Sequence, residues 1–137
     1  MYRVEKRFTV PIGHRLSKHA GRCKNIHGHN LVILVGLKTT SLNLNDMVMD
    51  FSDLKKMVGE LIDEWDHAVL INNIDKDLND TFEFANMRCI TFPFDPTAER
   101  LSEVLYNAIE SRIPLPTQMD YVTIFENENS KATFTVE

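Results

Sequence analysis

One apolar stretch, residues 29–39, constrains the fold of this chain more than any other part of the sequence. It reads His-Asn-Leu-Val-Ile-Leu-Val-Gly-Leu-Lys-Thr, and its β-branched and large apolar side chains favour a strand that is apolar on both faces. It starts at the end of a second stretch, residues 14–29, which holds four of the five histidines, one of the two cysteines and no acidic residue. The predicted strand therefore begins directly at the residues that carry most of the chemistry.

The remaining elements are predicted from shorter patterns. Residues 2–11 alternate around apolar side chains and predict a strand, whereas apolar residues at helical spacing predict helices over 52–65 and from a start at 95–99 to about 112. Shorter segments predict a strand end at 47–50, a turn at 70–73, a short strand at 87–92, and a hairpin of 121–126 with 132–136. This order is typical of an α+β fold: a mainly antiparallel sheet with two helices on one face, in a single domain over residues 1–137.

Chain length and the apolar runs indicate the number of domains and the cellular location. A chain of 137 residues fits one domain. The first residues are charged and no apolar segment of signal-peptide kind follows, and no apolar run approaches the roughly 18 residues that cross a membrane. We therefore expect a cytoplasmic protein with no membrane partner, in which Cys23 and Cys89 are free thiols, metal ligands or catalytic groups rather than a disulfide.

Charge is divided unevenly along the chain. Residues 6–45 carry seven Lys or Arg and no acid, whereas residues 46–137 carry seven basic and nineteen acidic residues. No recognition motif, basic helix or interleaved aromatic and basic residues accompanies the basic part, so we expect no nucleic-acid partner. Two interpretations stay open: the basic loop holds a small anionic ligand, or the basic part pairs with the acidic part of the same or a neighbouring subunit.

His27-Gly28-His29 predicts a metal site. In an extended backbone, side chains two positions apart point to the same face, roughly 6–7 Å apart at Cα, so both imidazoles reach one ion. His14, where the first strand enters the loop, supplies a third ligand, and three neutral histidines with one open position are typical of a catalytic zinc. His19 competes with His14 for that place, and an isolated His-X-His pair also occurs in solvated loops.

The two cysteines have different surroundings. Cys23 lies between Arg22 and Lys24, whose charges stabilise a thiolate. It is a candidate nucleophile or general base, with a fourth zinc ligand or an ordinary loop thiol as the alternatives. Cys89 lies within an apolar run and is expected to be a buried filler.

Carboxylates elsewhere in the chain suggest two more functional groups. Asp66 precedes His67 at the end of a predicted helix, so the carboxylate can orient the imidazole as a proton-transfer pair. Glu126 ends an apolar strand, where a carboxylate can accept two hydrogen bonds from an amidine-like ligand edge. The alternative for Glu126 is a surface charge at a strand end.

Several of these motifs, in this order, resemble the 6-pyruvoyltetrahydropterin synthase and 6-carboxytetrahydropterin synthase family. They are Gly13-His14-Arg15-Leu16, Cys23 followed after three residues by His27-Gly28-His29-Asn30, Met49-Asp50-Phe51-Ser52-Asp53-Leu54-Lys55, Trp65-Asp66-His67, Pro96-Thr97-Ala98-Glu99, and Glu126. The resemblance spans essentially the whole chain and implies the tunnelling fold (T-fold), in which the sheets of several subunits join into a barrel. It also implies a homo-oligomer, commonly a hexamer, with active sites at subunit interfaces.

The resemblance implies three groups of site residues. They are the Zn²⁺ ligands His14, His27 and His29; the catalytic Cys23, Asp66 and His67; and the substrate-binding Glu126, Thr97 and Glu99. It also implies that Cys23 and the Asp66–His67 pair come from different chains. The sequence departs from the family pattern at Arg100, where an asparagine is usual, and in residues 75–94, which are longer than in the short bacterial members.

The resemblance further implies a reaction. Three residues between the cysteine and His-Gly-His resemble the bacterial 6-carboxytetrahydropterin synthase of the queuosine (7-deazaguanine) pathway, and the cysteine itself argues against the folate branch. The implied activity is a zinc-dependent lyase that converts 7,8-dihydroneopterin triphosphate to 6-carboxy-5,6,7,8-tetrahydropterin and releases acetaldehyde and triphosphate. The alternatives are 6-pyruvoyltetrahydropterin synthase, which eliminates triphosphate without breaking a carbon–carbon bond, and a non-catalytic zinc or pterin-binding module.

Overall fold

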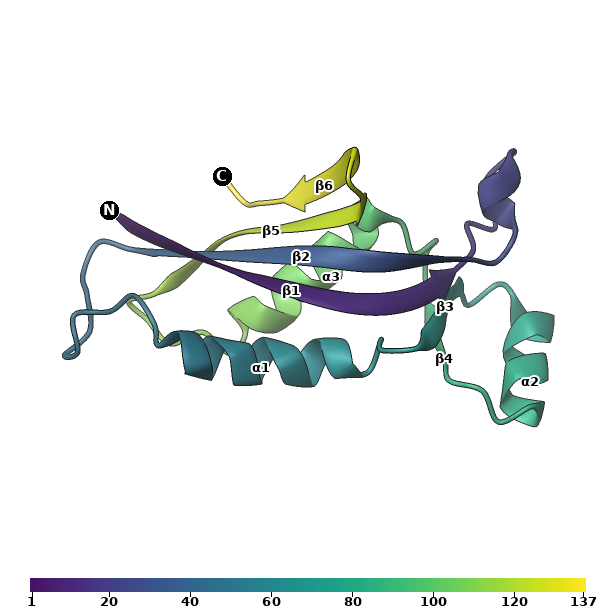
Figure 1. The fold of residues 1–137 in the computed structure, drawn as a ribbon, viewed down its shortest axis with the longest axis horizontal. Coiled ribbons are helices and arrows are strands. Elements are labelled where there is room, and N and C mark those ends of the chain that lie inside the picture. Colours follow the sequence, from purple (N-terminus) through teal and green to yellow (C-terminus); the bar gives the residue numbers. More distant parts are fainter.

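The structure is a computed structural model that describes residues 1–137, and it is an α+β fold (Figure 1). The strands are β1 (Tyr2–His14), β2 (His27–Thr39), β3 (Ala68–Asn72), β4 (Cys89–Phe92), β5 (Gln118–Asn127) and β6 (Ser130–Phe134). The helices are α1 (Phe51–Asp63), α2 (Lys76–Phe84) and α3 (Ala98–Glu110), with one 3-10 turn, η1 (Arg22–Lys24). No helix is long and apolar enough to cross a membrane.

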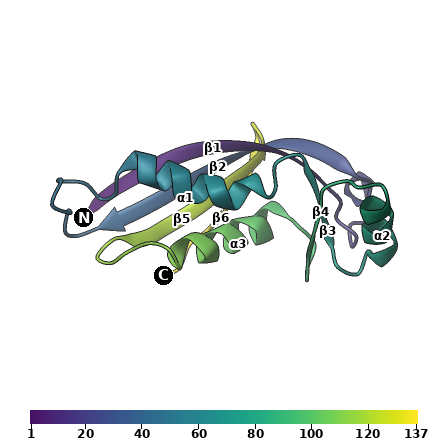
Figure 2. The ribbon, with the colours of Figure 1, turned by 90° about the horizontal axis from the view of Figure 1, so that it is seen from below.

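The six strands form one mixed sheet in the order β4-β3-β1-β2-β5-β6. The four strands β1, β2, β5 and β6 pair antiparallel, as predicted. The short strands β3 and β4 extend this sheet in parallel, β3 beside β1 and β4 beside β3, so the sheet is mixed but mainly antiparallel, as expected. Helices α1 and α3 lie side by side on one face of the sheet, as predicted (Figure 2).

One predicted feature was misplaced, one was wrong, and one helix was not predicted. Residues 70–73 were expected to turn, but the apolar run Ala68–Asn72 forms β3, and the turn follows at Asn73 and Ile74. Residues 47–50 form no strand; instead the carboxylate of Asp50 accepts a 2.7 Å hydrogen bond from the Ser52 amide and caps α1. No helix was predicted over α2, which is a third helix. Its apolar stripe is short, because only Leu78 and Phe82 lie at helical spacing and both are half-buried, and none of its residues is fully buried.

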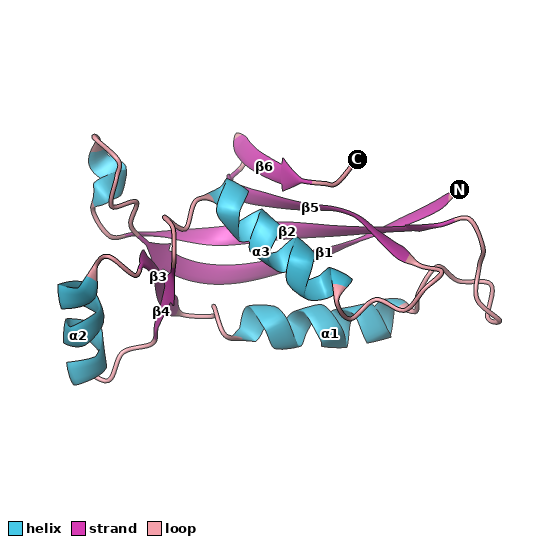
Figure 3. Cartoon of the chain, turned by 180° about the vertical axis from the view of Figure 1, so that it is seen from behind, coloured by secondary structure: helices cyan, strands magenta, loops and turns pink.

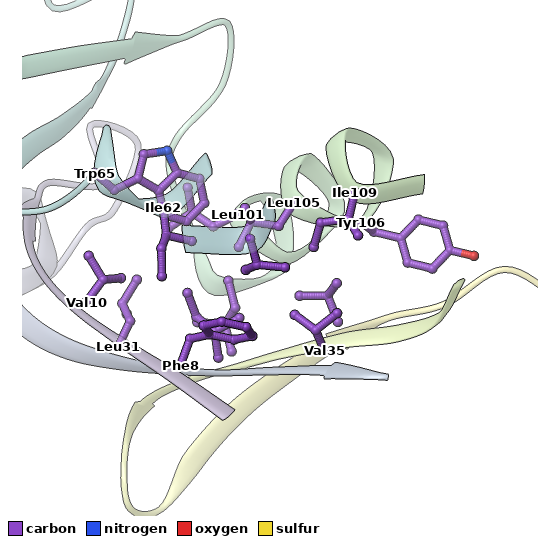
Figure 4. Close-up of a cluster of buried hydrophobic side chains, with 14 of the residues drawn as sticks. Phe8, Val10, Leu31, Val35, Ile62, Trp65, Leu101, Leu105, Tyr106 and Ile109 are labelled. Atoms are coloured by element: carbon purple, nitrogen blue, oxygen red, sulfur yellow. The ribbon is translucent and has the colours of Figure 1, made fainter. Parts of the chain in front are cut away.

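The core lies between the sheet and the pair of helices. Leu31, Ile33 and Val35 of β2 are completely buried on the helix-covered face, where they meet side chains of α3 such as Leu101 and Leu105 (Figure 4). On the opposite face of β2, Val32 and Leu34 are only half-buried, so this strand is not packed on both faces within one chain. The alternation fixes the register, since a slip by one residue would turn the buried set outward.

The two ends of the sheet differ. Both termini lie at one end, and η1, the short strands β3 and β4, and α2 gather at the other (Figure 3). β3 pairs with β1 only at Ile12, Gly13 and His14. The longer N-terminal part of β1 therefore has β2 on one side and an open strand edge on the other.

Candidate active site

The pairing of β1 with β2 brings three histidines together. In this antiparallel register His14 lies opposite His27, and Ile12 lies opposite His29. All three imidazoles project to the helix-covered face, in line with the buried side chains of both strands. Their ring centroids are 4.5–5.0 Å apart, and one ligand nitrogen from each lies within 4.8 Å of the others. We call His14, His27 and His29 the histidine cluster.

Hydrogen bonds set the tautomers in the histidine cluster. The Nδ1 of His14 donates to the carbonyl oxygen of Pro96 at 2.9 Å, and the Nδ1 of His27 donates to that of Asn25 at 2.7 Å, because a carbonyl oxygen can only accept. The neutral ring then carries its lone pair on Nε2. The Nε2 atoms of His14 and His29 are buried without any hydrogen-bond partner. Oriented rings with unpartnered, buried nitrogens fit a bound metal ion.

The charge state of His14 also suits a metal ligand. Burial is the largest influence and lowers the pKa of His14, and the neighbouring His27 and His29 lower it further. The hydrogen bond to Pro96 and the charge of Glu126 act in the opposite direction, but the net pKa lies below its ordinary value. A lowered pKa favours the neutral imidazole, which is the form that binds metals.

The competing ligand, His19, lies outside the histidine cluster. Its side chain is on the exposed part of the loop, and its Nδ1 accepts a 2.8 Å hydrogen bond from the Gly21 amide. The structure thus brings His14, and not His19, to His27 and His29.

Cys23 lies in η1, in the loop that joins β1 to β2. Its side chain is half-buried, while those of Arg22 and Lys24 are exposed. The carbonyl oxygen of Cys23 accepts a 2.9 Å hydrogen bond from the amide of Leu16, which closes the loop across its base. Cys89 begins β4 and is only partly buried, and burial raises the pKa of its thiol.

Asp66 and His67 contact each other, as their order in the sequence suggested. The Nδ1 of His67 lies 2.6 Å from Oδ1 of Asp66. The backbone of His67 is in the left-handed region with φ of 56°, and its amide donates to the carbonyl oxygen of Pro11 at 2.9 Å. The imidazole is 80% exposed. Within one chain the pair is therefore separate from the histidine cluster and presents its histidine to the outside.

The three residues expected to bind substrate differ in position. Glu99 and Glu126 line one hollow of about 330 Å³ beside the start of α3, together with Lys131 of β6. The negative charge of Glu126 also raises the pKa of His14, although burial lowers it more. Thr97 does not line this hollow; its Oγ1 accepts a 3.2 Å hydrogen bond from the Arg100 amide and caps α3.

Sequence reasoning missed the groups that hold the loop. Asp95 accepts hydrogen bonds from Ser17 and from the amide of Lys18, and Asp75 pairs with Arg15 at 3.3 Å. Asp95 and Asp75 each lie far along the chain from the loop residues that they hold, so no local spacing connects them. The sequence Asp95-Pro96 before the α3 cap was the one feature that drew attention to Asp95, and it indicated only the start of a helix.

Sequence comparison agrees with this architecture. The family model described as 6-pyruvoyl tetrahydropterin synthase matches residues 3–137. The chain belongs to this family. It is 29% identical to the 6-carboxy-5,6,7,8-tetrahydropterin synthase of Aquifex aeolicus, with 99% of each chain covered. It is 31% identical to the protein of the same name from Haemophilus influenzae, over 80% of this chain and 83% of the relative.

Two solved structures support the fold. An uncharacterized protein of Wolinella succinogenes superposes with a TM-score of 0.85 at 25% identity, over 99% of this chain and 98% of the other. The 6-pyruvoyl tetrahydropterin synthase of Caenorhabditis elegans superposes with a TM-score of 0.73 at 23% identity, over 99% and 96% of the two chains. The fold is therefore the T-fold of this family, and the histidine cluster is consistent with the metal site typical of it.

Proposed function

We propose that this protein is a zinc-dependent lyase that converts 7,8-dihydroneopterin triphosphate and one water molecule to 6-carboxy-5,6,7,8-tetrahydropterin, with release of acetaldehyde and triphosphate. The observation that carries the proposal is the histidine cluster with its unpartnered, buried Nε2 atoms. It occurs in a chain whose relatives from two bacteria are named 6-carboxy-5,6,7,8-tetrahydropterin synthase. A cytoplasmic location, where thiols stay reduced, suits the free Cys23 of this proposal.

In the proposed reaction, His14, His27 and His29 hold the metal. Bound Zn²⁺ supplies Lewis-acid chemistry, which lowers the pKa of coordinated hydroxyl groups and stabilises negative charge on oxygen. Carbonyl oxygens accept the Nδ1 protons of His14 and His27, which orients these two neutral rings with Nε2 free to bind the metal.

The proton transfers in this proposal belong to two groups of the chain. Cys23, as a thiolate, takes a proton from a substrate carbon beside the pterin ring and returns it at the neighbouring carbon. His67 is the second acid and base, and the carboxylate of Asp66, 2.6 Å from its Nδ1, stabilises the imidazolium that forms. Glu126 binds the amidine-like edge of the ring, beside Glu99 in the shared hollow.

The charged loop supplies a binding surface for the triphosphate. Arg15 is already paired with Asp75, whereas Lys18, Arg22 and Lys24 are exposed and form no ion pair within the chain. Three cations on one loop attract a polyanion over a distance set by the ionic strength. We assign these three residues to the triphosphate.

We also propose that the protein works as a homo-oligomer, with the hexamer as the expected form. Three features of the single chain support this: the open edge of β1, the half-buried apolar residues Val32 and Leu34 on the uncovered sheet face, and the exposed His67. Exposed strand edges and apolar faces are costly in a monomer. In such an assembly, His67 of one chain completes the site beside Cys23 of another.

Product identification tests the reaction. Purified, zinc-loaded protein is incubated with 7,8-dihydroneopterin triphosphate, and the pterin product and acetaldehyde are measured by mass spectrometry. We expect 6-carboxy-5,6,7,8-tetrahydropterin and one acetaldehyde for each pterin. A 6-pyruvoyl product without acetaldehyde would establish the alternative synthase. Binding of zinc and pterin with no turnover would establish a non-catalytic module.

A further inference from the structure

Asp95 lies at a junction of three segments that are distant in sequence. Its Oδ1 accepts a 2.5 Å hydrogen bond from the Ser17 hydroxyl and a 3.0 Å bond from the Asn72 side-chain amide. Its Oδ2 accepts a 2.9 Å bond from the backbone amide of Lys18. One carboxylate thus joins the loop after β1, the end of β3 and the entry to α3, and it uses both oxygens to do so.

The helix does not account for this carboxylate. Thr97, and not Asp95, caps α3 with its side chain. An Asp that served only the helix dipole would face the free amides of the first turn. The carboxylate of Asp95 instead bonds to the loop and to β3, so its role concerns the loop.

Two short paths lead from Asp95 to functional side chains. Along the loop, Asp95 fixes Ser17 and Lys18, and the preceding residue, Leu16, donates its amide to the carbonyl oxygen of Cys23. Along its own segment, the next residue is Pro96, whose carbonyl oxygen accepts from His14 at 2.9 Å. This one carboxylate therefore links the Cys23 loop to the segment whose carbonyl oxygen orients His14.

We propose that Asp95 is a positioning residue that fixes the Cys23 loop against the histidine cluster and so sets the place of the thiol in the active site. The proposal rests on the proposed function as far as Cys23 takes part in the reaction. The loop has a second attachment, because Arg15 pairs with Asp75 at 3.3 Å. That pair holds the loop to the start of α2, whereas Asp95 holds it to the strand and helix that adjoin the metal ligands.

Hydrogen bonds to an ionised carboxylate are among the stronger ones in proteins. Burial raises the pKa of Asp95, but the hydrogen bonds from Ser17, Asn72 and Lys18 outweigh it, and the net pKa lies below its ordinary value. Asp95 is therefore a carboxylate at neutral pH and accepts from all three donors. An asparagine at this position keeps only one accepting oxygen, and an alanine keeps none.

The test measures the thiol directly, in zinc-loaded protein that carries Cys89→Ser so that Cys23 is the single cysteine. The variants are Asp95→Ala, Asp95→Asn and Ser17→Ala. The matched control is Asp80→Ala, which removes an exposed carboxylate from α2. For each variant, the rate of alkylation of Cys23 by iodoacetamide, the zinc content, kcat and KM are measured.

We expect Asp95→Ala to speed the alkylation of Cys23 and to lower kcat, each by at least about tenfold, the factor that corresponds to losing one of the three hydrogen bonds to the carboxylate. Zinc content stays within about twofold because the histidines are untouched, and KM changes less than kcat because Glu126 is untouched. Asp95→Asn and Ser17→Ala give smaller changes in the same direction, and Asp80→Ala gives none.

Two results would overturn the proposal. One is an alkylation rate in Asp95→Ala equal to that in Asp80→Ala; the other is loss of zinc with an unchanged alkylation rate, which would place the effect on His14 alone. If Asp95→Ala does not fold, Asp95→Asn and Ser17→Ala decide in the same way, because each removes only part of the attachment. If the parent protein has no lyase activity, the proposed function fails, and the alkylation rates still decide the role of Asp95.

Discussion

The Nδ1 atom of His14 lies 2.9 Å from the carbonyl oxygen of Pro96, 82 residues further along the chain. This hydrogen bond joins the end of β1 to the segment that begins α3. It orients the ring, so that the buried Nε2 faces the other two histidines without a partner of its own. The geometry of the histidine cluster is therefore a tertiary property that depends on contacts between distant segments.

The first prediction concerns the metal. Because three ligands are needed to hold a zinc ion firmly in such a site, His14→Ala is expected to lower the zinc content from near one per chain to well under about half. His19→Ala is the matched control, since it removes a histidine from the same loop but outside the histidine cluster. Zinc is measured by elemental analysis after dialysis against zinc-free buffer. Equal zinc contents in the two variants would contradict the assignment.

A second prediction concerns the Asp66–His67 pair. Asp66→Asn removes the negative charge that lies 2.6 Å from Nδ1 of His67. General acid–base groups contribute about 10²–10⁴-fold to rates, so we expect kcat to fall by about a hundredfold with KM and zinc content unchanged. The control is Asp63→Asn, which neutralises an exposed acid in the last turn of α1. A kcat that stays within about twofold of the parent would show that the carboxylate takes no part.

Much of the fold could be predicted because it depends on local patterns. The alternation of buried and exposed residues in β1 and β2 encodes the strands, their register and the shared face of the histidines. The turn expected at 70–73 was placed about two residues too early. Asn72 and Asn73 are typical turn residues, and the chain does turn at Asn73 and Ile74, where the Asp75 amide donates to the carbonyl oxygen of Asn72 and the Ile74 amide donates to its side chain. Asn72 also ends β3 and donates to Asp95 from its buried side chain, a distant contact that local spacing does not reveal.

The candidate site likewise has residues that local spacing predicted and residues that only the tertiary structure brings together. His27 and His29 are close in sequence, so spacing alone predicted that they point together. The choice between His14 and His19 required the partner strand, and the influence of the Glu126 charge on His14 required the tertiary fold. Asp95 could not be found at all, because its donors lie 23 to 78 residues away in sequence.

A third prediction separates capping from substrate binding at Thr97. The Oγ1 of Thr97 accepts from the Arg100 amide, so Thr97→Ala is expected to lower the free energy of unfolding by about 1 kcal/mol. Thr97→Ser keeps the hydroxyl and is expected to be nearly neutral. Both are measured by urea denaturation. A rise in KM for Thr97→Ala, beyond that for Thr97→Ser, would add a substrate contact to the capping role.

The fourth prediction is the pH dependence of stability at Asp95. Its pKa is lower in the folded than in the unfolded chain, so the unfolded state takes up its proton first as the pH falls. The stabilisation is therefore complete above the ordinary pKa, which is 3.8, and is lost as the pH falls through the lowered value. We compare urea midpoints at pH 6 and at pH 3 for the parent, Asp95→Asn and Asp80→Asn. The urea midpoint should fall less between pH 6 and pH 3 for Asp95→Asn than for the parent and Asp80→Asn. All three proteins contain the same histidines, so these contribute equally. Equal falls in the midpoint would exclude a contribution of Asp95 to the pH dependence.

The last prediction concerns Glu126, which lines the hollow beside α3 with Glu99. Removing a charged acceptor from a bound ligand costs about 1.5–3 kcal/mol, so Glu126→Gln is expected to raise the Kd for a pterin by about 10- to 150-fold. Glu128→Gln, in the exposed turn between β5 and β6, is the control. Binding of neopterin, measured by fluorescence, avoids any dependence on turnover.

Glu126→Gln should leave the metal in place, and the reason follows from His14. The negative charge of Glu126 raises the pKa of His14, so its removal favours the neutral imidazole and cannot weaken zinc binding by protonation. A loss of pterin affinity with full zinc content would therefore mark Glu126 as a ligand-binding residue. Loss of both zinc and pterin binding would instead mean that Glu126 supports the histidine cluster. An unchanged Kd would mean that Glu126 is only a surface charge at the end of a strand.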